Sequence, residues 1–265
     1  MNFEDRIKYF LIERYEQSFA KPFKRENAHY HVLEKTEDNF FKYDSNLLHR
    51  NQFHRWAGSV KSSQAMAYNL LRNFKNVKFE YPLPALEEKA PAMLDAFVPD
   101  GHRVNHLYEV KMTEFLANNK ISFSERYFDK GAYKDAENAF AEKYISFIKK
   151  VQKNFETTPI YGTGIKQLCC HLLGITKKVI GSDPSNNDTY MLYSLCFDGW
   201  EDEVFINKLS AYKNALTRFK THVDEFIQEI GLSHRVRYVG FVGTHAFIKE
   251  NKDNIAKECV TRYSL

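Results

Sequence analysis

The stretch "MLDAFVPDGHRVNHLYEVKM", from Met93 to Met112, consists of two apolar runs on either side of a polar turn. Asp100-Gly101 in the turn is a dipeptide that is favoured in tight hairpins. The sequence therefore predicts an antiparallel hairpin with strands over 91–99 and 105–112.

Each arm of this hairpin has an acid near its centre: Asp95 in the first arm and Glu109 in the second, with Lys111 two residues further on. Strand side chains alternate between faces, so Glu109 and Lys111 share a side, and Asp95 can converge with Glu109 if the strands pair. Buried carboxylates without partners are costly, and neighbouring carboxylates repel each other. A divalent cation removes both costs, and Mg²⁺ prefers oxygen ligands. The pattern predicts a hard-metal site; the alternative is an ion pair of Lys111 with either acid at a solvated strand edge.

The rest of the chain alternates between helical and extended patterns. Apolar spacing and capping residues predict helices over 3–19, 63–74, 133–155, 164–174, 202–231 and 247–259. The fourth of these is expected to end at Gly174, and the fifth allows one break. Further strands are predicted over 77–83, 189–198 and 235–243. This order predicts a single α/β domain, with a mixed sheet and helices on both of its faces.

The net charge of +4 arises mostly from basic residues that precede the acidic hairpin. Lys and Arg neutralise phosphates, so this distribution is compatible with a polyanionic partner; the alternative is an ordinary mixed surface. The four cysteines form no CxxC pair, the N-terminal segment lacks a signal-peptide pattern, and no apolar run reaches the roughly 20 residues of a membrane span. We therefore expect a soluble, cytoplasmic protein with no membrane partner.

At the acidic hairpin the chain resembles the PD-(D/E)XK nuclease superfamily. Asp95 matches the first acid of the motif, Glu109 the second acid and Lys111 the lysine. The residue before Asp95 is Leu94 rather than proline, which is a departure that the superfamily often tolerates.

Two further stretches resemble a restriction-endonuclease-like branch of that superfamily, which contains mostly uncharacterised bacterial proteins. "SSQAMAYNLL" (Ser62–Leu71) is similar to the helix ahead of the core sheet, and "KQLCCHLLG" (Lys166–Gly174) to a Gln-containing helix after the catalytic strand. Gln167 and His171 lie four residues apart, on one helical face. Related nucleases carry a Gln and an aromatic residue at this spacing, so His171 is a second departure from the pattern.

The resemblance implies an α/β fold with a restriction-endonuclease-like core, in which a central mixed β-sheet is flanked by helices. One nuclease domain would span 1–265. Its core would cover 56–198, after a helical N-terminal extension over 1–55 and before C-terminal helices and a late strand over 199–265. The implied partner is DNA, and a homodimer stays open because cutting both strands usually requires two active sites.

The implied reaction is Mg²⁺-dependent hydrolysis of phosphodiester bonds in DNA by an endonuclease of the restriction or defence type. Asp95, Glu109 and the Val110 carbonyl would bind Mg²⁺, or Mn²⁺ in its place, and Lys111 would orient the attacking water or help to deprotonate it. Two alternatives stay open. One is an exonuclease or DNA-repair nuclease that needs a free end, and the other is a non-catalytic DNA-binding module with the nuclease fold.

Other residues are weaker candidates for the same site. Gln64 and Gln167 would join the catalytic set: Gln64 as a contact to the scissile phosphate or to a metal-bound water, and Gln167 as a contact to a phosphate. The alternatives are a helix-cap amide for Gln64 and a polar helix residue that makes one backbone hydrogen bond for Gln167. Glu80 is a candidate additional metal ligand on the strand before the hairpin, whereas Glu87 and Glu88 are more typical of a solvated loop.

Three further patterns have competing interpretations. The basic segment 47–61, which contains Trp56, could grip a nucleic-acid backbone and stack a base, or form the solvated face of a helix packed on the core. The glycines of 161–167 could present amides to a phosphate at a helix start, although they do not form a nucleoside-triphosphate loop. His29 and His31 lack the further ligands that a metal site needs.

Overall fold

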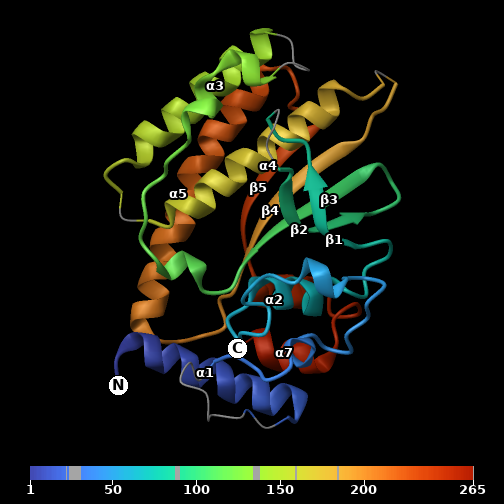
Figure 1. The fold of residues 1–265 in the computed structure, drawn as a ribbon, viewed down its shortest axis with the longest axis vertical. Coiled ribbons are helices and arrows are strands. Elements are labelled where there is room, and N and C mark those ends of the chain that lie inside the picture. The colour runs from blue at the N-terminus through green and yellow to red at the C-terminus, as the bar shows by residue number, and fades with distance from the viewer. Residues whose placement is uncertain are drawn as a thin grey trace.

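The computed structural model in Figure 1 describes residues 1–21, 23, 31–86, 90–133, 138–158, 160–183 and 185–264. Its centre is a five-stranded sheet in the order β1 (Lys78–Leu83), β2 (Ala92–Pro99), β3 (Val104–Lys111), β4 (Thr189–Cys196) and β5 (Val236–Gly243). The first three strands pair antiparallel, and β3, β4 and β5 pair parallel. The predicted mixed sheet is therefore confirmed.

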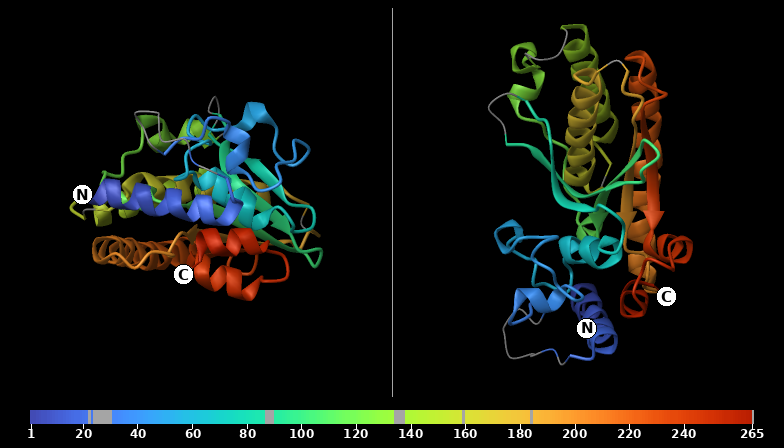
Figure 2. Two further views of the ribbon diagram at one scale, coloured as in Figure 1. Left: turned by 90° about the horizontal axis from the view of Figure 1, so that it is seen from below. Right: turned by 90° about the vertical axis from the view of Figure 1, so that its right-hand side faces the viewer.

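Two groups of helices flank this sheet, as the views in Figures 1 and 2 show. The upper group in Figure 1 contains α3 (Asn138–Phe155), α4 (Gly162–Ile180) and α5 (Glu203–Glu229). The lower group, which also holds both chain ends, contains α1 (Phe3–Phe19), α2 (Ser63–Leu71) and α7 (Lys257–Tyr263). The short helix α6 (Thr244–Glu250) follows β5 directly and contacts that strand. None of the described helices is long and apolar enough to cross a bilayer.

The predicted hairpin forms as expected. Gly101 has a φ of +81°, which glycine adopts without a steric penalty, and the Asp100 amide donates to the Val104 carbonyl at 3.0 Å. The other strands also lie within two residues of their predicted bounds. The segment 1–55 is helical only in part: after α1 its described residues contain the 3₁₀ turns η1 (Thr36–Asn39) and η2 (Arg50–Gln52).

Several helix bounds differ from those predicted. The helix predicted over 247–259 is two helices, α6 and α7, and the long α5 runs without a break. The helix predicted over 63–74 ends at Leu71, and α3 is helical from Asn138, after the 3₁₀ turn η5 (Lys130–Tyr133) and the undescribed residues 134–137. Two further 3₁₀ turns, η3 (Glu114–Leu116) and η4 (Glu125–Phe128), lie between β3 and η5.

The prediction that a helix stops at Gly174 is wrong, because α4 continues through that residue to Ile180. A methyl group on Gly174 would lie 2.6 Å from Leu83 Cβ and 2.7 Å from the Pro84 carbonyl oxygen. Glycine is therefore present because β1 passes close to the helix, not because the helix ends. This close approach packs α4 against the edge strand β1, next to the strands β2 and β3 that carry Asp95 and Glu109.

The first strand changes the direction of its side chains at Glu80, whose φ is +48°. Before this residue, Phe79 packs on Tyr68 of α2, with ring centroids 5.2 Å apart. After it, the Tyr81 hydroxyl accepts a hydrogen bond of 2.6 Å from Lys178 of α4. A left-handed backbone is uncommon in a residue with a side chain and is enriched at functional sites. Glu80 therefore lies at the position where the side chains of β1 change from contacts with the lower helical group to contacts with the upper one.

The N-terminal segment is tied to the C-terminal helix through Arg262, which is fully buried. Its guanidinium donates 2.5 Å to Asn39 Oδ1 and lies 5.2 Å from the ring centre of Tyr15 and 4.8 Å from that of Phe19. Cation–π contacts of this kind gain strength when they are removed from water. The two chain ends thus form one packed unit beneath the sheet.

Candidate active site

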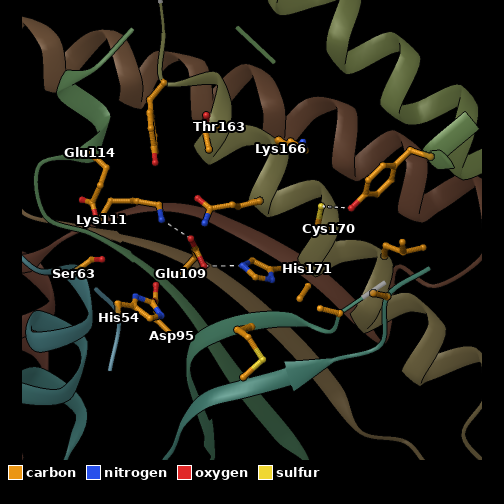
Figure 3. Close-up of a pocket in the computed structure, with 18 residues that line it drawn as sticks. His54, Ser63, Asp95, Glu109, Lys111, Glu114, Thr163, Lys166, Cys170 and His171 are labelled. Atoms are coloured by element: carbon orange, nitrogen blue, oxygen red, sulfur yellow. Dashed lines mark hydrogen bonds and ion pairs between the residues drawn. The ribbon is translucent and has the colours of Figure 1, made fainter. Parts of the chain in front are cut away.

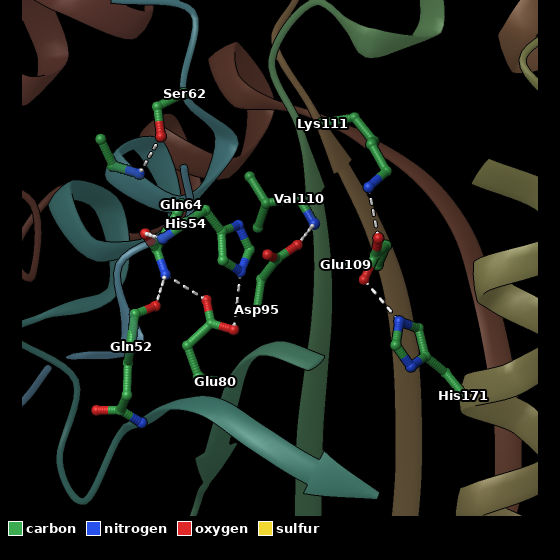
Figure 4. A network of polar contacts seen from close by, with 11 residues as sticks. Gln52, His54, Ser62, Gln64, Glu80, Asp95, Glu109, Val110, Lys111 and His171 are labelled. Carbon is green, nitrogen blue, oxygen red and sulfur yellow. Dashed lines mark hydrogen bonds and ion pairs between the residues drawn. The ribbon is translucent and has the colours of Figure 1, made fainter. Parts of the chain in front are cut away.

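The two predicted acids of the hairpin meet where the pairing of β2 with β3 stops. The last paired residues at this end are Ala96 and Tyr108, and the next pair in the same register would be Asp95 and Glu109. Instead, the Val110 amide donates a hydrogen bond of 2.6 Å to Asp95 Oδ2 (Figure 4). The side chain of Asp95 thus takes the place of a backbone partner and lies beside the second strand.

The Val110 carbonyl is also directed toward this opening. In a strand, the N–H and C=O of one residue point to the same side, and those of the next residue to the other. The Lys111 carbonyl accepts from the Phe197 amide at 2.9 Å, on the side of β4. The Val110 carbonyl therefore points toward β2, where the ladder has ended and Asp95 lies, which is compatible with its predicted role as a metal ligand.

Glu109 is held by two cationic or proton-bearing partners. Its Oε1 accepts from Lys111 Nζ at 2.5 Å, and its Oε2 lies 2.7 Å from His171 Nε2 of α4 (Figure 3). All three residues are buried. Burial alone would raise the pKa of Glu109, but Lys111 and His171 together lower it to about 2. The Glu109–Lys111 ion pair considered above thus exists, but it is buried instead of lying at a solvated edge.

Asp95 has the opposite electrostatic environment. Its burial raises the pKa of the carboxyl group well above the usual value, and the charge of Glu109 raises it further. Lys111 and the Val110 amide only partly offset these effects. The site therefore combines an acid that stays ionised with an adjacent acid that readily holds a proton, and a cation beside both acids would favour ionisation of the second.

Gln64 and Glu80 contact each other instead of the two acids. Gln64 Nε2 donates to Glu80 Oε1 at 2.7 Å and to the Gln52 carbonyl at 2.8 Å, and Gln64 Oε1 accepts from the His54 amide at 3.0 Å. Glu80 Oε2 lies 3.1 Å from His54 Nε2. Ser62 caps α2 by accepting from the Ala65 amide, which fixes the start of this helix. Figure 4 shows this cluster on one side of Asp95 and the Glu109 cluster on the other.

The hydrogen bonds of Gln64 and Glu80 change their expected roles. Both carboxylate oxygens of Glu80 already have partners. This arrangement suits a residue that positions His54 better than an additional metal ligand. The hydrogen bond that His54 donates to Glu80 raises the pKa of His54, although burial opposes this effect. Gln64 in turn fixes Glu80 and the backbone of His54.

A pocket of about 530 Å³ contains the two acids of the hairpin. Of the residues predicted for the site, Asp95, Glu109, Lys111 and Gln167 line it, whereas Gln64, Glu80 and Val110 do not. Gln167 Oε1 is buried and has no hydrogen-bond partner among the described residues. A polar atom in this state is suited to a contact with water or substrate.

Several residues of the pocket were not predicted as part of the site. They include His54, Glu114, Thr163, Lys166 and Cys170, which Figure 3 labels around the cavity. The helical spacing of Lys166, Gln167, Cys170 and His171 is a signal that could have identified one wall, because these residues share neighbouring turns of α4. His54 is distant in sequence, and only the folded chain brings it to Glu80.

The helix start at 161–167 does not offer its amides to a phosphate. The Gly162 amide donates to the Asn119 carbonyl at 3.1 Å, and the Thr163 amide donates to Asn119 Oδ1 at 2.7 Å. The next two amides donate to the Tyr161 carbonyl. The phosphate-binding interpretation of these glycines is therefore wrong.

The donors at the acidic pair suit Mg²⁺ or Mn²⁺ better than zinc. Within the part of the chain that the structure describes, no three His, Cys, Asp or Glu residues are grouped to hold a metal ion. Mg²⁺ is nevertheless commonly bound by only one or two carboxylates, with water and phosphate as the other ligands. Asp95 Oδ1 accepts no hydrogen bond from a described residue, and Asp95 lines the pocket. Glu87, Glu88 and His29 lie outside the described residues.

No protein family, curated protein or solved structure was found to match this chain. The resemblance to the PD-(D/E)XK nucleases therefore depends on the motif residues Asp95, Glu109 and Lys111 and on the two helical stretches. The arguments for a function come from the positions and hydrogen bonds of Asp95, Glu109 and Lys111 in the pocket.

Proposed function

We propose that this protein is a metal-dependent endodeoxyribonuclease of the restriction or defence type, with a restriction-endonuclease-like core. It would hydrolyse phosphodiester bonds of DNA in the pocket between β2, β3 and α4. One observation carries this proposal. Asp95 and Glu109 meet at the end of a strand ladder, inside a pocket, with the buried ammonium group of Lys111 bound to Glu109.

Asp95, Glu109 and the Val110 carbonyl would hold the ion. When bound, Mg²⁺ or Mn²⁺ lowers the pKa of water and stabilises negative charge on phosphoryl oxygens. Burial opposes ionisation of Lys111, but Glu109 and then Asp95 raise its pKa above the ordinary value. Lys111 is thus protonated at neutral pH, so its role is to orient the attacking water and to offset negative charge, not to act as a base.

The residues around the acids would support this chemistry. His171 fixes the orientation of Glu109 through its Nε2 contact. The amide oxygen of Gln167, which has no partner among the described residues, can accept a hydrogen bond from water or orient a substrate group. Lys166 lines the same pocket and can neutralise a phosphate. Gln64 and Glu80 act indirectly, because they position His54.

The test is DNA cleavage by matched variants. Supercoiled plasmid and phage DNA are incubated with the protein in Mg²⁺, in Mn²⁺ and in EDTA. We expect metal-dependent cleavage by the wild type, with losses of about 100- to 1,000-fold in Asp95→Asn and Lys111→Met, because each removes a group that stabilises the transition state. The exposed residues Asp253 and Lys120 supply the controls Asp253→Asn and Lys120→Ala. Equal cleavage by all variants, or no cleavage of any DNA by folded wild type, would count against the proposal.

Two related activities are distinguished by the same assay. An exonuclease degrades linear DNA and spares closed circles. A non-catalytic DNA-binding module shows salt-sensitive affinity without a metal-dependent product. The second alternative draws support from Glu109, whose charge is already balanced by Lys111.

A further inference from the structure

A second pocket of about 730 Å³ opens beside the candidate active site. It shares three lining residues with the first pocket: His54, Ser63 and Glu114. These three side chains lie together on one side of the first pocket in Figure 3. The two pockets are therefore parts of one continuous groove, and a polymer bound at the acids would extend into the second pocket.

The second pocket contains an exposed indole. Trp56 lines it and has 53% of its surface exposed, although tryptophan is usually highly buried. No ring pair within the described part of the chain includes Trp56; its neighbour is Arg55, whose guanidinium carbon lies 5.0 Å from the ring centre. An indole beside a guanidinium is a surface on which a nucleobase can stack.

The charges of the second pocket favour an anion near Trp56. Arg55 has no acidic partner among the described residues. Two acids, Glu4 and Glu114, also line the pocket, but the carboxylate of each already has a partner. Glu4 is 3.5 Å from Lys61, and Glu114 Oε2 accepts from the Met112 and Thr113 amides. Arg55 is thus the cation available for a phosphate next to a stacked base.

We propose that this second pocket binds an unpaired segment of a nucleic-acid strand, with a base stacked on Trp56 and the adjoining phosphate bound by Arg55. In a duplex the faces of the bases are covered by their neighbours, so only an unpaired base can offer its face to an indole. A pocket of this volume matches a small-molecule site, which is the scale of a nucleotide and not of a double helix. The inference rests on the proposed function for the choice of DNA, and it assigns a substrate with a single-stranded region next to the scissile bond.

Binding in EDTA tests the pocket without cleavage. Fluorescence anisotropy is measured with a labelled oligothymidylate and with a blunt duplex of equal length. We expect Trp56→Ala to weaken oligothymidylate binding by about 5- to 150-fold, which corresponds to about 1–3 kcal/mol of stacking. Trp56→Phe should keep most of the affinity, and duplex binding should not change. Arg55→Ala should also weaken binding and reduce its salt dependence, whereas the exposed-residue control Lys252→Ala should not.

The inference is overturned if the wild type does not bind oligothymidylate, if Trp56→Ala binds it like the wild type, or if Trp56→Ala loses duplex affinity equally. A separate Mg²⁺ assay then compares a flapped duplex with a blunt one. Faster cleavage of the flap by wild type, lost in Trp56→Ala, supports both proposals. If oligothymidylate binding depends on Trp56 but no DNA is cleaved, the nuclease proposal is refuted and the binding site is supported. If DNA is cleaved but Trp56→Ala affects neither binding nor cleavage, the binding site is refuted and the nuclease proposal is supported.

Discussion

Replacement of Glu109 by glutamine should destabilise the protein strongly at neutral pH. Glutamine keeps the shape of the side chain but removes the charge that Lys111 and His171 contact at 2.5 Å and 2.7 Å. The pKa of Glu109 is lowered from 4.5 to about 2. Each tenfold change in proton affinity corresponds to about 1.4 kcal/mol, so the ionised carboxylate contributes roughly 3–4 kcal/mol to stability. This agrees with the roughly 3–5 kcal/mol that is lost when one partner of a buried ion pair is removed.

The pH dependence provides a second part of this prediction. A carboxyl group whose pKa is lowered by folding stabilises the protein above its unfolded pKa, and this stabilisation is lost as the pH falls through the folded pKa. The difference in unfolding free energy between wild type and Glu109→Gln should therefore have its maximum value at pH 7. It should shrink as the pH falls from 4.5 to about 2. The same interaction raises the pKa of Lys111, so its energy is counted once.

Urea unfolding followed by circular dichroism measures the effect, with Glu156→Gln as the control because Glu156 is exposed. Thermal unfolding should show a fall in Tm of roughly 6–16 °C for Glu109→Gln, at about 2–4 °C per kcal/mol for a chain of this size. The reasoning is refuted if Glu109→Gln and wild type unfold at the same urea concentration at pH 7. It is also refuted if the difference does not depend on pH.

Three further predictions concern the same region. Asp95→Asn should lower cleavage by about 100- to 1,000-fold yet raise the Tm of the metal-free protein. The raised pKa of Asp95 means that its charge destabilises the fold, so wild type recovers stability as the pH falls through this pKa. A lower Tm for the variant than for wild type at pH 8 would contradict this. Mn²⁺ at 100 times its Kd should stabilise wild type by about 2.7 kcal/mol and should not stabilise Asp95→Asn. Differential scanning fluorimetry measures both Tm values. An equal rise in Tm for the two proteins would show that the ion binds elsewhere. Gly174→Ala should lower the free energy of unfolding, measured in urea, by about 1–2 kcal/mol. A contact of 2.6 Å between the new methyl group and Leu83 outweighs the roughly 1 kcal/mol by which alanine stabilises a helix relative to glycine. The control Gly181→Ala, at the end of α4, should leave the free energy of unfolding nearly unchanged.

The strands could be predicted from the sequence because their signals are local. Asp100-Gly101 and the flanking apolar runs determine the hairpin without reference to the rest of the chain. Gly174 shows the limit of such reasoning. A glycine near the end of an apolar stretch usually marks a helix end, but here the nearest neighbour is Leu83, which is 91 residues away in sequence and lies on another element. Only the tertiary contact explains why this helix continues.

The side-chain partners of the candidate site were less predictable than its position. Alternation along the strands correctly places Glu109 and Lys111 together. It does not predict that Glu80 adopts a positive φ, because that conformation is rare for glutamate. As a result, Glu80 and Gln64, which the sequence suggests as separate contributors to one site, bind each other and His54 instead.

The different charge states of Asp95 and Glu109 depend on a residue outside the acidic motif. The motif spacing alone places Lys111 near both acids and cannot decide which of them it neutralises. His171 adds a second contact to Glu109 from α4, and Gly174 allows this helix to lie close to β1. Glu109 is therefore ionised with two partners, while Asp95 has, among the residues that the structure describes, only the Val110 amide within hydrogen-bond distance. His171→Phe, which removes the Nε2 contact to Glu109, should thus raise the pKa of Glu109 and narrow the difference in pKa between Glu109 and Asp95. Carboxyl titration by NMR would detect this change, and an unaltered Glu109 titration would show that Lys111 alone sets its charge.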